Sequence, residues 1–270
     1  MIMTILNSCR NPYNYTDIDG PQYLCLDHDV PAETNEDMLT VVSYNIEEAK
    51  NIHLAINLLK GDEHLSTADV ILLQEMDREG MKRLSDALKM NYIYFPINSS
   101  KNSSKDFGNG ILTRNCINQY KKIILPHGQA HNNRLRSFTS ATINYNGVEI
   151  QLVSAQLATV VMPSRKRKDQ VKALRKYLDD SQDSLTISIV GGDFNAVTSD
   201  YRNFISTEMQ KSNHAHSSKG LGSTIRKKIP FATPELDMIF SKNLQILSRG
   251  KVVNKKVSDH YPIWVKYKVK

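Results

Sequence analysis

The sequence is poor in cysteine and has no long apolar run. Its three cysteines, Cys9, Cys25 and Cys116, form no CxxC pair and no even set for a disulfide framework. No apolar stretch approaches the roughly 20 residues that a membrane helix needs, and the first six residues are too few for the apolar region of a signal peptide. We therefore expect reduced thiols in a cytoplasmic protein without a transmembrane segment, with non-classical secretion as the alternative.

Acidic residues are fewer than basic ones. The 270 residues include 28 Asp and Glu against 35 Lys and Arg, so the formal net charge is +7. This balance favours a polyanionic partner, either nucleic acid or an anionic phospholipid surface. Basic residues cluster at 165–168, at 226–228 and around Lys251, Lys255 and Lys256. A solvated basic surface without a partner is the alternative, and charge alone does not separate DNA, RNA and phospholipid.

Apolar patterns predict a mixed α/β fold. Short runs rich in apolar residues predict strands, at 38–44, 68–74, 110–113, 138–144, 148–154, 185–190, 236–240 and 263–268. Apolar residues at helical spacing predict helices at 52–60, at 80–89 and from Ser164, as the cap, to about Leu178. Asn146-Gly147 is a hairpin turn between two of the strands. Because hairpins and helix-covered strands both occur, we expect mixed sheets.

Residues 1–37 differ in composition from the rest of the chain. Asn, Asp, Tyr and Pro dominate them, and Asn11-Pro12 and Gly20-Pro21 are turn signals. We expect an irregular N-terminal arm, either flexible or packed on the body of the protein. The candidate site residues extend over most of the remaining chain, so residues 38–270 are expected to form one catalytic domain. We expect the protein to be a monomer.

Polar residues lie in or at the ends of several predicted strands, where a sheet can bring them to one rim. They are Asn45, Glu75, Asp193, Asn195, Asp237, Asp259 and His260. Such a cluster suits a divalent cation and a phosphate ester, because Mg²⁺ prefers carboxylate and amide oxygens. Glu75 fits as the principal metal ligand, with the Asn45 amide nearby and Asp259 as a further carboxylate. Mn²⁺ is the expected substitute ion.

The remaining residues of this set suit hydrolysis. Asp193 can orient the attacking water or accept its proton, and Asn195 can donate a hydrogen bond to the phosphoryl oxygens. His260 can act as an acid–base group or stabilise the transition state, with Asp237 or Asp259 orienting its other nitrogen. The Gly191-Gly192 pair permits a sharp exit from the strand that aims Asp193 and Asn195 together.

Six segments occur in an order that resembles the endonuclease/exonuclease/phosphatase superfamily. They are residues 41–46, 70–75, 108–114, 192–196, 236–240 and 258–262. The superfamily includes pancreatic-type deoxyribonucleases, apurinic endonucleases and neutral sphingomyelinases. The resemblance implies a four-layered α/β sandwich of two packed mixed sheets flanked by helices, and Mg²⁺-dependent cleavage of phosphoesters. It also implies metal binding by Asn45 and Glu75 and hydrolysis by the other five residues. Asn109, within the third segment, is a substrate-binding candidate.

One position departs from the family pattern. Many members have Thr-His-Leu where this chain has Ala155-Gln156-Leu157, and that histidine contacts the scissile phosphate. Gln156 can donate a hydrogen bond but cannot carry a positive charge or transfer a proton. Apurinic endonucleases also lack the histidine, so we keep Gln156 as a catalytic candidate. Arg167, in an Arg-x-x-Gln pattern, and Arg226 are candidate phosphate contacts.

The substrate is less well determined by the sequence. The preferred hypothesis is a Mg²⁺-dependent nuclease or related phosphodiesterase acting on nucleic acid, because the chain is basic. A phospholipid or sphingomyelin phosphodiesterase is the alternative, with residues 92–97 as an apolar membrane-contacting loop unless they form a core strand. A third hypothesis is a catalytically silent binding or effector module, supported by Gln156 alone. Inositol polyphosphate 5-phosphatases are disfavoured, because their characteristic residues after Asn195 are missing.

Two histidine pairs resemble metal ligands by spacing only. His127 and His131 are four residues apart, but Pro126 and Gly128 argue against a helix there. His214 and His216 lie in a polar loop, and two imidazoles alone make a poor metal site. We expect both pairs to lie at the surface.

Overall fold

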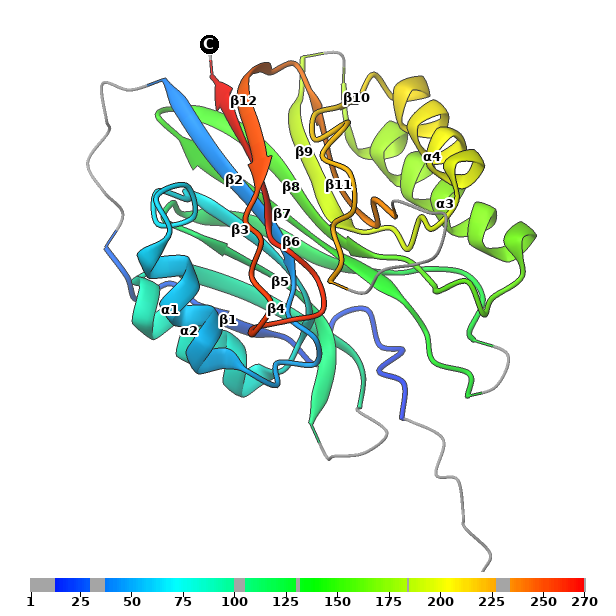
Figure 1. Ribbon diagram of the computed structural model, residues 1–270, viewed down its shortest axis with the longest axis horizontal. Coiled ribbons are helices and arrows are strands. Elements are labelled where there is room, and N and C mark those ends of the chain that lie inside the picture. Colours follow the sequence, from blue (N-terminus) through cyan, green and yellow to red (C-terminus); the bar gives the residue numbers. More distant parts are fainter. Residues whose placement is uncertain are drawn as a thin grey trace, which may run out of the picture.

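Two mixed β-sheets pack face to face in the computed structural model, and two helices cover the outer face of each (Figure 1). The structure describes residues 13–29, 37–99, 105–129, 132–183, 185–226 and 234–269. This arrangement confirms the predicted four-layered α/β sandwich in a single domain.

The first sheet has seven strands and the second has six. In spatial order, the first contains β1 (Tyr23–Cys25), β4 (Asn91–Ser99), β5 (Asp106–Thr113), β3 (Val70–Met76), β2 (Met38–Asn45), β13 (Ile263–Lys268) and β12 (Gln245–Lys251). The second contains β10 (Ala215–His216), β11 (Asp237–Lys242), β9 (Ile187–Asp193), β8 (Val148–Gln156), β7 (Ser137–Tyr145) and β6 (Ile117–Ile124). Helices α1 (Ile52–Gly61) and α2 (Arg78–Leu88) pack on the first sheet, and α3 (Ser164–Ser181) and α4 (Ser199–Lys211) on the second.

The alternation of side chains along each strand explains the three layers of core. In β2, Val42 and Tyr44 point to the helices α1 and α2, whereas Leu39 and Val41 point to the other sheet. The strands in the centre of both sheets are apolar on both faces for this reason. Their apolar runs were therefore visible in the sequence, and all the predicted strands exist, with shifted ends at several of them, including β3, β5, β9 and β11.

The helices differ from the prediction in their ends and in number. Helix α2 begins at Arg78, because Asp77 caps it by accepting a hydrogen bond from the Gly80 backbone. Ser164 is not a cap: it is the first residue of α3, Pro163 precedes it, and no side chain caps that end. Helix α4 was not predicted, although Thr198 caps it and Tyr201, Ile205 and Met209 form its buried stripe. The stripe is interrupted by polar residues, and this weakened its periodicity.

The N-terminal segment is more ordered than an irregular arm. Strand β1 pairs antiparallel with β4 and extends the first sheet. Closer to the start of the chain, Asn14 forms an isolated bridge with Asn98. The buried Lys122 ammonium donates to the carbonyls of Tyr15 and Gly20, at 3.2 and 2.7 Å. The described residues 13–29 are therefore packed on the body; the rest of the arm, at 1–12 and 30–36, lies outside the described residues.

Residues 92–97 form part of β4 and are buried. The expectation that they form a membrane-contacting loop is therefore wrong, because both faces of this strand are covered by the core. Within the described parts of the chain, no helix has the length and apolarity needed to cross a membrane.

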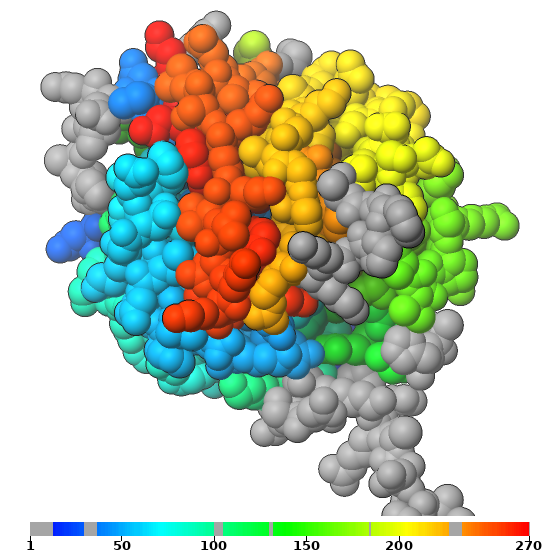
Figure 2. Space-filling view, in the orientation of Figure 1, coloured from blue at the N-terminus to red at the C-terminus, as the bar shows by residue number. Residues whose placement is uncertain are grey.

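The segment between β12 and β13 lies at the surface between α1 and the segment that follows β10 (Figure 2). Asn51 at the start of α1 donates to the Val257 carbonyl, and Arg226 donates to that of Lys255. These contacts hold the turn that carries Asp259 and His260 against both halves of the sandwich. The described cysteines, Cys25 and Cys116, are free.

Candidate functional site

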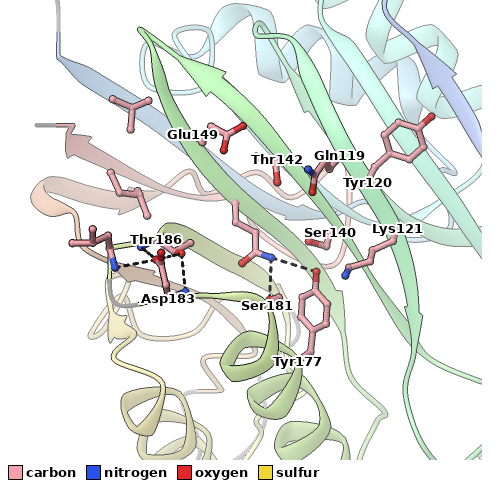
Figure 3. A pocket seen from close by; sticks show the side chains of 14 residues that line it. Gln119, Tyr120, Lys121, Ser140, Thr142, Glu149, Tyr177, Ser181, Asp183 and Thr186 are labelled. Atoms are coloured by element: carbon pink, nitrogen blue, oxygen red, sulfur yellow. Dashed lines mark hydrogen bonds between the residues drawn. The ribbon is translucent and has the colours of Figure 1, made fainter.

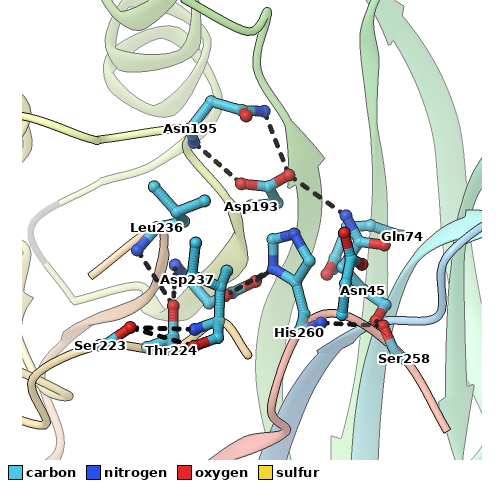
Figure 4. A network of polar contacts seen from close by, with 12 residues as sticks. Asn45, Gln74, Asp193, Asn195, Ser223, Thr224, Leu236, Asp237, Ser258 and His260 are labelled. Atoms are coloured by element: carbon cyan, nitrogen blue, oxygen red, sulfur yellow. Dashed lines mark hydrogen bonds and ion pairs between the residues drawn. The ribbon is translucent and has the colours of Figure 1, made fainter. Parts of the chain in front are cut away.

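Strand pairing brings the predicted polar residues to one end of the sandwich. In the second sheet, Asp237 of β11 lies opposite Asp193 of β9, which in turn lies opposite Gln156 of β8. In the first sheet, the parallel strands β2 and β3 end together, so Asn45 lies beside the residue that precedes Glu75. The ends of the two sheets face each other across the site (Figure 4).

The end of β9 shows why two glycines precede Asp193. A Cβ atom on Gly192 would lie 1.9 Å from the carbonyl oxygen of Ala155 in the neighbouring strand. Only glycine allows this close approach. The next residue, Asp193, is thereby held at the rim with its carboxylate directed across the site.

The Asp193 carboxylate accepts three hydrogen bonds. They come from the Asn195 backbone at 2.9 Å, the Asn195 side-chain amide at 3.1 Å and the Asn45 amide at 3.2 Å. Burial raises the pKa of Asp193 to about 7, against the opposing influence of the His260 cation. A carboxylate that titrates near neutrality can accept a proton from water under physiological conditions.

His260 pairs with Asp237. Its Nδ1 lies 2.8 Å from one carboxylate oxygen of Asp237, and both side chains are buried. The sequence left Asp237 and Asp259 as alternatives for this role, and the hydrogen bond selects Asp237. Thr224 Oγ1 accepts from the Asp237 backbone and Ser258 Oγ from the His260 backbone, so both residues of the pair are fixed in place.

The imidazole of His260 is cationic at neutral pH. Burial by itself lowers the pKa of His260, but the carboxylates of Asp237 and Asp193 outweigh burial and raise it to about 10. Ligand atoms of these three residues lie within 4.8 Å of one another, as a metal site would require. His260 Nδ1 is already hydrogen-bonded to Asp237, so this imidazole would offer only its Nε2 atom to a metal ion.

Glu75 and Asn45 offer the donor set expected of a hard cation. The Glu75 backbone is left-handed, with φ of 58°, at a register shift between β3 and β5. This unusual backbone directs a half-buried carboxylate into the site, where one oxygen accepts a 2.7 Å hydrogen bond from Gln156. The side-chain amide oxygen of Asn45 accepts one hydrogen bond, from the Glu47 backbone, which leaves a lone pair. One carboxylate and one amide oxygen are what Mg²⁺ commonly takes from a protein.

Two acidic residues of the site were missed in the sequence. Glu47 and Glu48 follow Asn45 after one intervening residue, Ile46, and together with Ala49 they have left-handed backbones with φ of 47°, 54° and 53°. The Glu47 carboxylate accepts a hydrogen bond from the backbone of Asp259 at 3.0 Å. The signal was present as Glu-Glu after the first motif, but nothing in the pattern tied it to the C-terminal turn.

The predicted substrate-binding residues are in three different environments. Asn109 is buried in β5 and donates to the Ser137 carbonyl at 2.7 Å. Arg167 is buried, with its guanidinium 4.2 Å from the centre of the Tyr201 ring and 3.5 Å from the Asn195 carbonyl. Arg167 therefore stabilises the loop that carries Asn195, whereas the other basic residues of 165–168 are exposed to solvent. Arg226 is exposed, and residues 227–228 of its cluster lie outside the described residues.

The expectation for the second histidine pair was wrong in part. His214 is buried between α4 and the second sheet, where it contacts Ser188 Oγ at 2.7 Å. Burial lowers the pKa of His214 and of the half-buried His216 to about 4. Both are neutral structural groups at pH 7. His127 is exposed as predicted and contacts Asp169, while residue 131 lies outside the described residues.

A separate hollow of about 640 Å³ lies on the outer face of the second sheet (Figure 3). Its lining includes Glu149 and Thr186, near the ends of β8 and β9 that are opposite the catalytic rim. In its wall the Gln151 amide donates to Tyr177 and Ser181, so these polar groups already have partners. The hollow contains none of the predicted site residues.

Fold and site together define a phosphoester hydrolase of the kind that uses a divalent metal ion. The chain belongs to the endonuclease/exonuclease/phosphatase family, whose model matches residues 42–260. The match includes the predicted catalytic and metal-binding residues and leaves out the N-terminal segment and β1. No curated protein matches the chain.

Solved structures of the same family share the fold at low sequence identity. An endonuclease/exonuclease/phosphatase from Beutenbergia cavernae has a TM-score of 0.70 at 17% identity, covering 86% of this chain and 72% of that one. D. rerio TDP2 complexed with a single-strand DNA product has a TM-score of 0.63 at 16% identity, covering 85% and 98%. A Bacteroides thetaiotaomicron mannosyl-6-phosphatase has a TM-score of 0.63 at 16% identity, covering 85% and 99%.

Proposed function

We propose that the protein is a Mg²⁺-dependent phosphodiesterase that cleaves nucleic acid. The observation that carries the proposal is the buried His260–Asp237 pair beside Asp193, which places a cation and a titratable carboxylate together at one rim. The net charge of +7 supports a polyanionic substrate. The likeness in fold to D. rerio TDP2, whose complex holds a single-strand DNA product, is compatible with this choice.

Glu75 and Asn45 would hold the ion, with Asp259 as a further carboxylate at the same rim. When bound, Mg²⁺ or Mn²⁺ polarises the phosphate and lowers the pKa of water. Gln156 holds the Glu75 carboxylate in position through its 2.7 Å hydrogen bond. In this role Gln156 orients a metal ligand, which does not require the charge that a histidine could carry.

The other residues act on the reacting atoms. Asp193, with a pKa of about 7, accepts a proton from the attacking water. The Asn195 amide already donates to Asp193 and to the Leu157 carbonyl, so Asn195 fixes the direction of the Asp193 carboxylate instead of donating to the phosphoryl oxygens as the sequence predicted. The His260 cation stabilises the charge that develops on the phosphoryl oxygens and can protonate the leaving oxygen. Asp237 holds the imidazole through Nδ1, which leaves Nε2 to face the substrate.

A lipid phosphodiester is the second candidate substrate, and one observation favours it. Val160 and Val161, just after β8 and near the rim, are 55% and 62% exposed. Adjacent exposed apolar side chains beside an active site can contact a membrane. They replace residues 92–97 as the candidate for membrane contact, because those residues are buried.

A substrate panel with matched variants tests the proposal. Wild-type protein with Mg²⁺ at low salt is incubated with single-strand DNA, duplex DNA, RNA and sphingomyelin liposomes. We expect cleavage of nucleic acid that His260→Gln abolishes and that chelation removes. The double variant Val160→Ser/Val161→Ser tests the alternative that the substrate is a lipid phosphodiester. Hydrolysis of liposomes alone, lost in that double variant, would replace the nuclease proposal with the lipid one.

A further inference from the structure

Two arginines near the site have no role in the chemistry described above. Arg136 directly precedes β7 and is 5% exposed, and its Nε and Nη1 are buried without a hydrogen-bond partner among the described residues. Arg134 is half-buried, and its Nη2 atom is also buried without a hydrogen-bond partner among the described residues. Neither guanidinium forms an ion pair within the described parts of the chain.

Unpartnered cations inside a protein are unfavourable. Nearly all buried polar groups have partners, and a buried charge without one is among the strongest exceptions. Both guanidinium groups are held over the Phe107 ring, at 4.4 and 5.1 Å from its centre. The ring fixes their position but accepts none of their N–H groups in a conventional hydrogen bond. The free donors therefore point to an anionic group that is supplied from outside.

The location of Arg136 relative to the catalytic residues follows from strand pairing. Phe138 lies opposite Ala155, so Ser137 falls opposite Gln156, which pairs with Asp193. Strands are about 4.8 Å apart, so the backbone just after Arg136 lies roughly two strand spacings from that of Asp193. The arginine is close to the site but beyond the reacting groups.

The charges that act on each group support the same placement. Arg136 is influenced by the carboxylates of Glu75 and Asp193, whereas His260 is influenced by those of Asp237, Asp193 and Asp259. The strand order agrees: β7, which follows Arg136, and β8, whose Gln156 contacts Glu75, lie on one side of β9 and its Asp193, whereas β11, whose Asp237 contacts His260, lies on the other.

The N-terminal segment holds the arginines in place. The Asn14 side chain donates to the Asn133 carbonyl at 2.9 Å and accepts from the Leu135 backbone at 3.2 Å. These two bonds bracket Arg134, whose Nε donates to the Asn98 side chain at 3.0 Å. Asn14 lies outside residues 42–260, the part of the chain that the family model matches.

We propose that Arg134 and Arg136 bind a phosphoryl group of the substrate that flanks the one being cleaved. Asn14 is a positioning residue for this pair. The inference rests on the proposed function, because it requires a substrate with at least two phosphoryl groups, as in an oligonucleotide. Two fork-shaped guanidinium groups match phosphate oxygens in geometry as well as charge.

Binding of inorganic phosphate tests the site without turnover. Calorimetric titration of the full chain in EDTA measures the affinity of wild type, Arg136→Gln, Arg136→Lys and the exposed control Arg83→Gln. Losing charged hydrogen bonds should weaken phosphate binding about 10- to 100-fold in Arg136→Gln, with Arg136→Lys in between and Arg83→Gln unchanged. Equal affinity in wild type and Arg136→Gln, or no binding to wild type, overturns the proposal. If Arg136→Gln does not fold, the half-buried Arg134→Gln takes its place.

Two substrates test the flanking position. Bis(p-nitrophenyl) phosphate has only the phosphoryl group that is cleaved, whereas an oligonucleotide also has its neighbours. Arg136→Gln and Asn14→Ala should raise KM for the oligonucleotide about tenfold or more and leave kcat/KM for the small diester within about twofold. Equal losses on both substrates overturn the flanking assignment. If wild type cleaves only the small diester while Arg136→Gln still loses phosphate binding, the nuclease proposal fails and the arginine site stands.

Discussion

The His260–Asp237 pair provides the sharpest test of the catalytic assignment. Asp237→Asn keeps the size of the side chain and an oxygen that can accept from Nδ1, but it removes the negative charge. That carboxylate lies 2.8 Å from the imidazole and is the strongest influence that raises the pKa of His260 to about 10. The substitution therefore changes the charge of the imidazole and leaves the shape of the site largely intact.

The expected effect is largest at alkaline pH. An opposite charge at this distance shifts a pKa by about 1–3 units, so His260 should lose its proton that much earlier in the variant. Hydrogen bonds to charged groups contribute about 1.5–3 kcal/mol, which corresponds to a fall of roughly 10- to 150-fold in kcat where the variant imidazole is neutral. At lower pH, where the imidazole is protonated in both proteins, the loss should be smaller.

The assay is the pH profile of kcat for a chromogenic phosphodiester at saturating Mg²⁺. For wild type, activity should rise through about pH 7, as Asp193 loses its proton, and fall only near pH 10, as His260 loses its own. In Asp237→Asn the alkaline limb should move toward neutrality while the acidic limb changes less. Asp200→Asn, on the exposed start of α4, is the control for charge removal. An unchanged alkaline limb in Asp237→Asn would refute the reasoning.

Three further predictions concern the metal, the close-packed rim and the substrate charge. Glu75→Gln should weaken Mg²⁺ binding by calorimetry about tenfold or more, because the charged ligand is lost; unchanged affinity would exclude Glu75 as a ligand. Gly192→Ala should lower the free energy of unfolding in urea by about 3 kcal/mol or more, because the new Cβ atom would lie 1.9 Å from the Ala155 carbonyl oxygen. In the control Gly61→Ala, the new Cβ atom would have no atom within 4 Å, so the free energy of unfolding should not fall. If nucleic acid is the substrate, log K for binding should fall linearly with log salt; a flat dependence would contradict phosphate recognition.

The role of Gln156 illustrates how a departure from a family pattern acquires a physical meaning. In the sequence, Gln156 stood where many family members have a histidine, and it was the only support for a catalytically silent binding or effector module. In the structure its amide donates to Glu75, the residue best suited to bind the ion. A neutral donor holds a metal-binding carboxylate without competing for the ion with a positive charge.

Much of the fold and site followed from local patterns. The central strands are apolar on both faces, so runs such as 70–73 were visible without knowledge of their neighbours. Polar residues at the ends of neighbouring strands, such as Gln156, Asp193 and Asp237, meet at one rim once these strands pair. The elements that were missed, α4 and β12 among them, are exposed on one side and have patterns interrupted by polar residues.

Tertiary structure alone decided the partners and the burial of particular groups. Asp237 rather than Asp259 orients His260, and His214 is buried despite its polar sequence neighbourhood. Arg134 and Arg136 were not recognised, because an arginine before a strand has no distinctive spacing. Burial and charge pairing depend on residues far away in the chain, such as Asn14 and Phe107 for these arginines. Local periodicity reports which face of an element is apolar, and only the packed chain determines what meets that face.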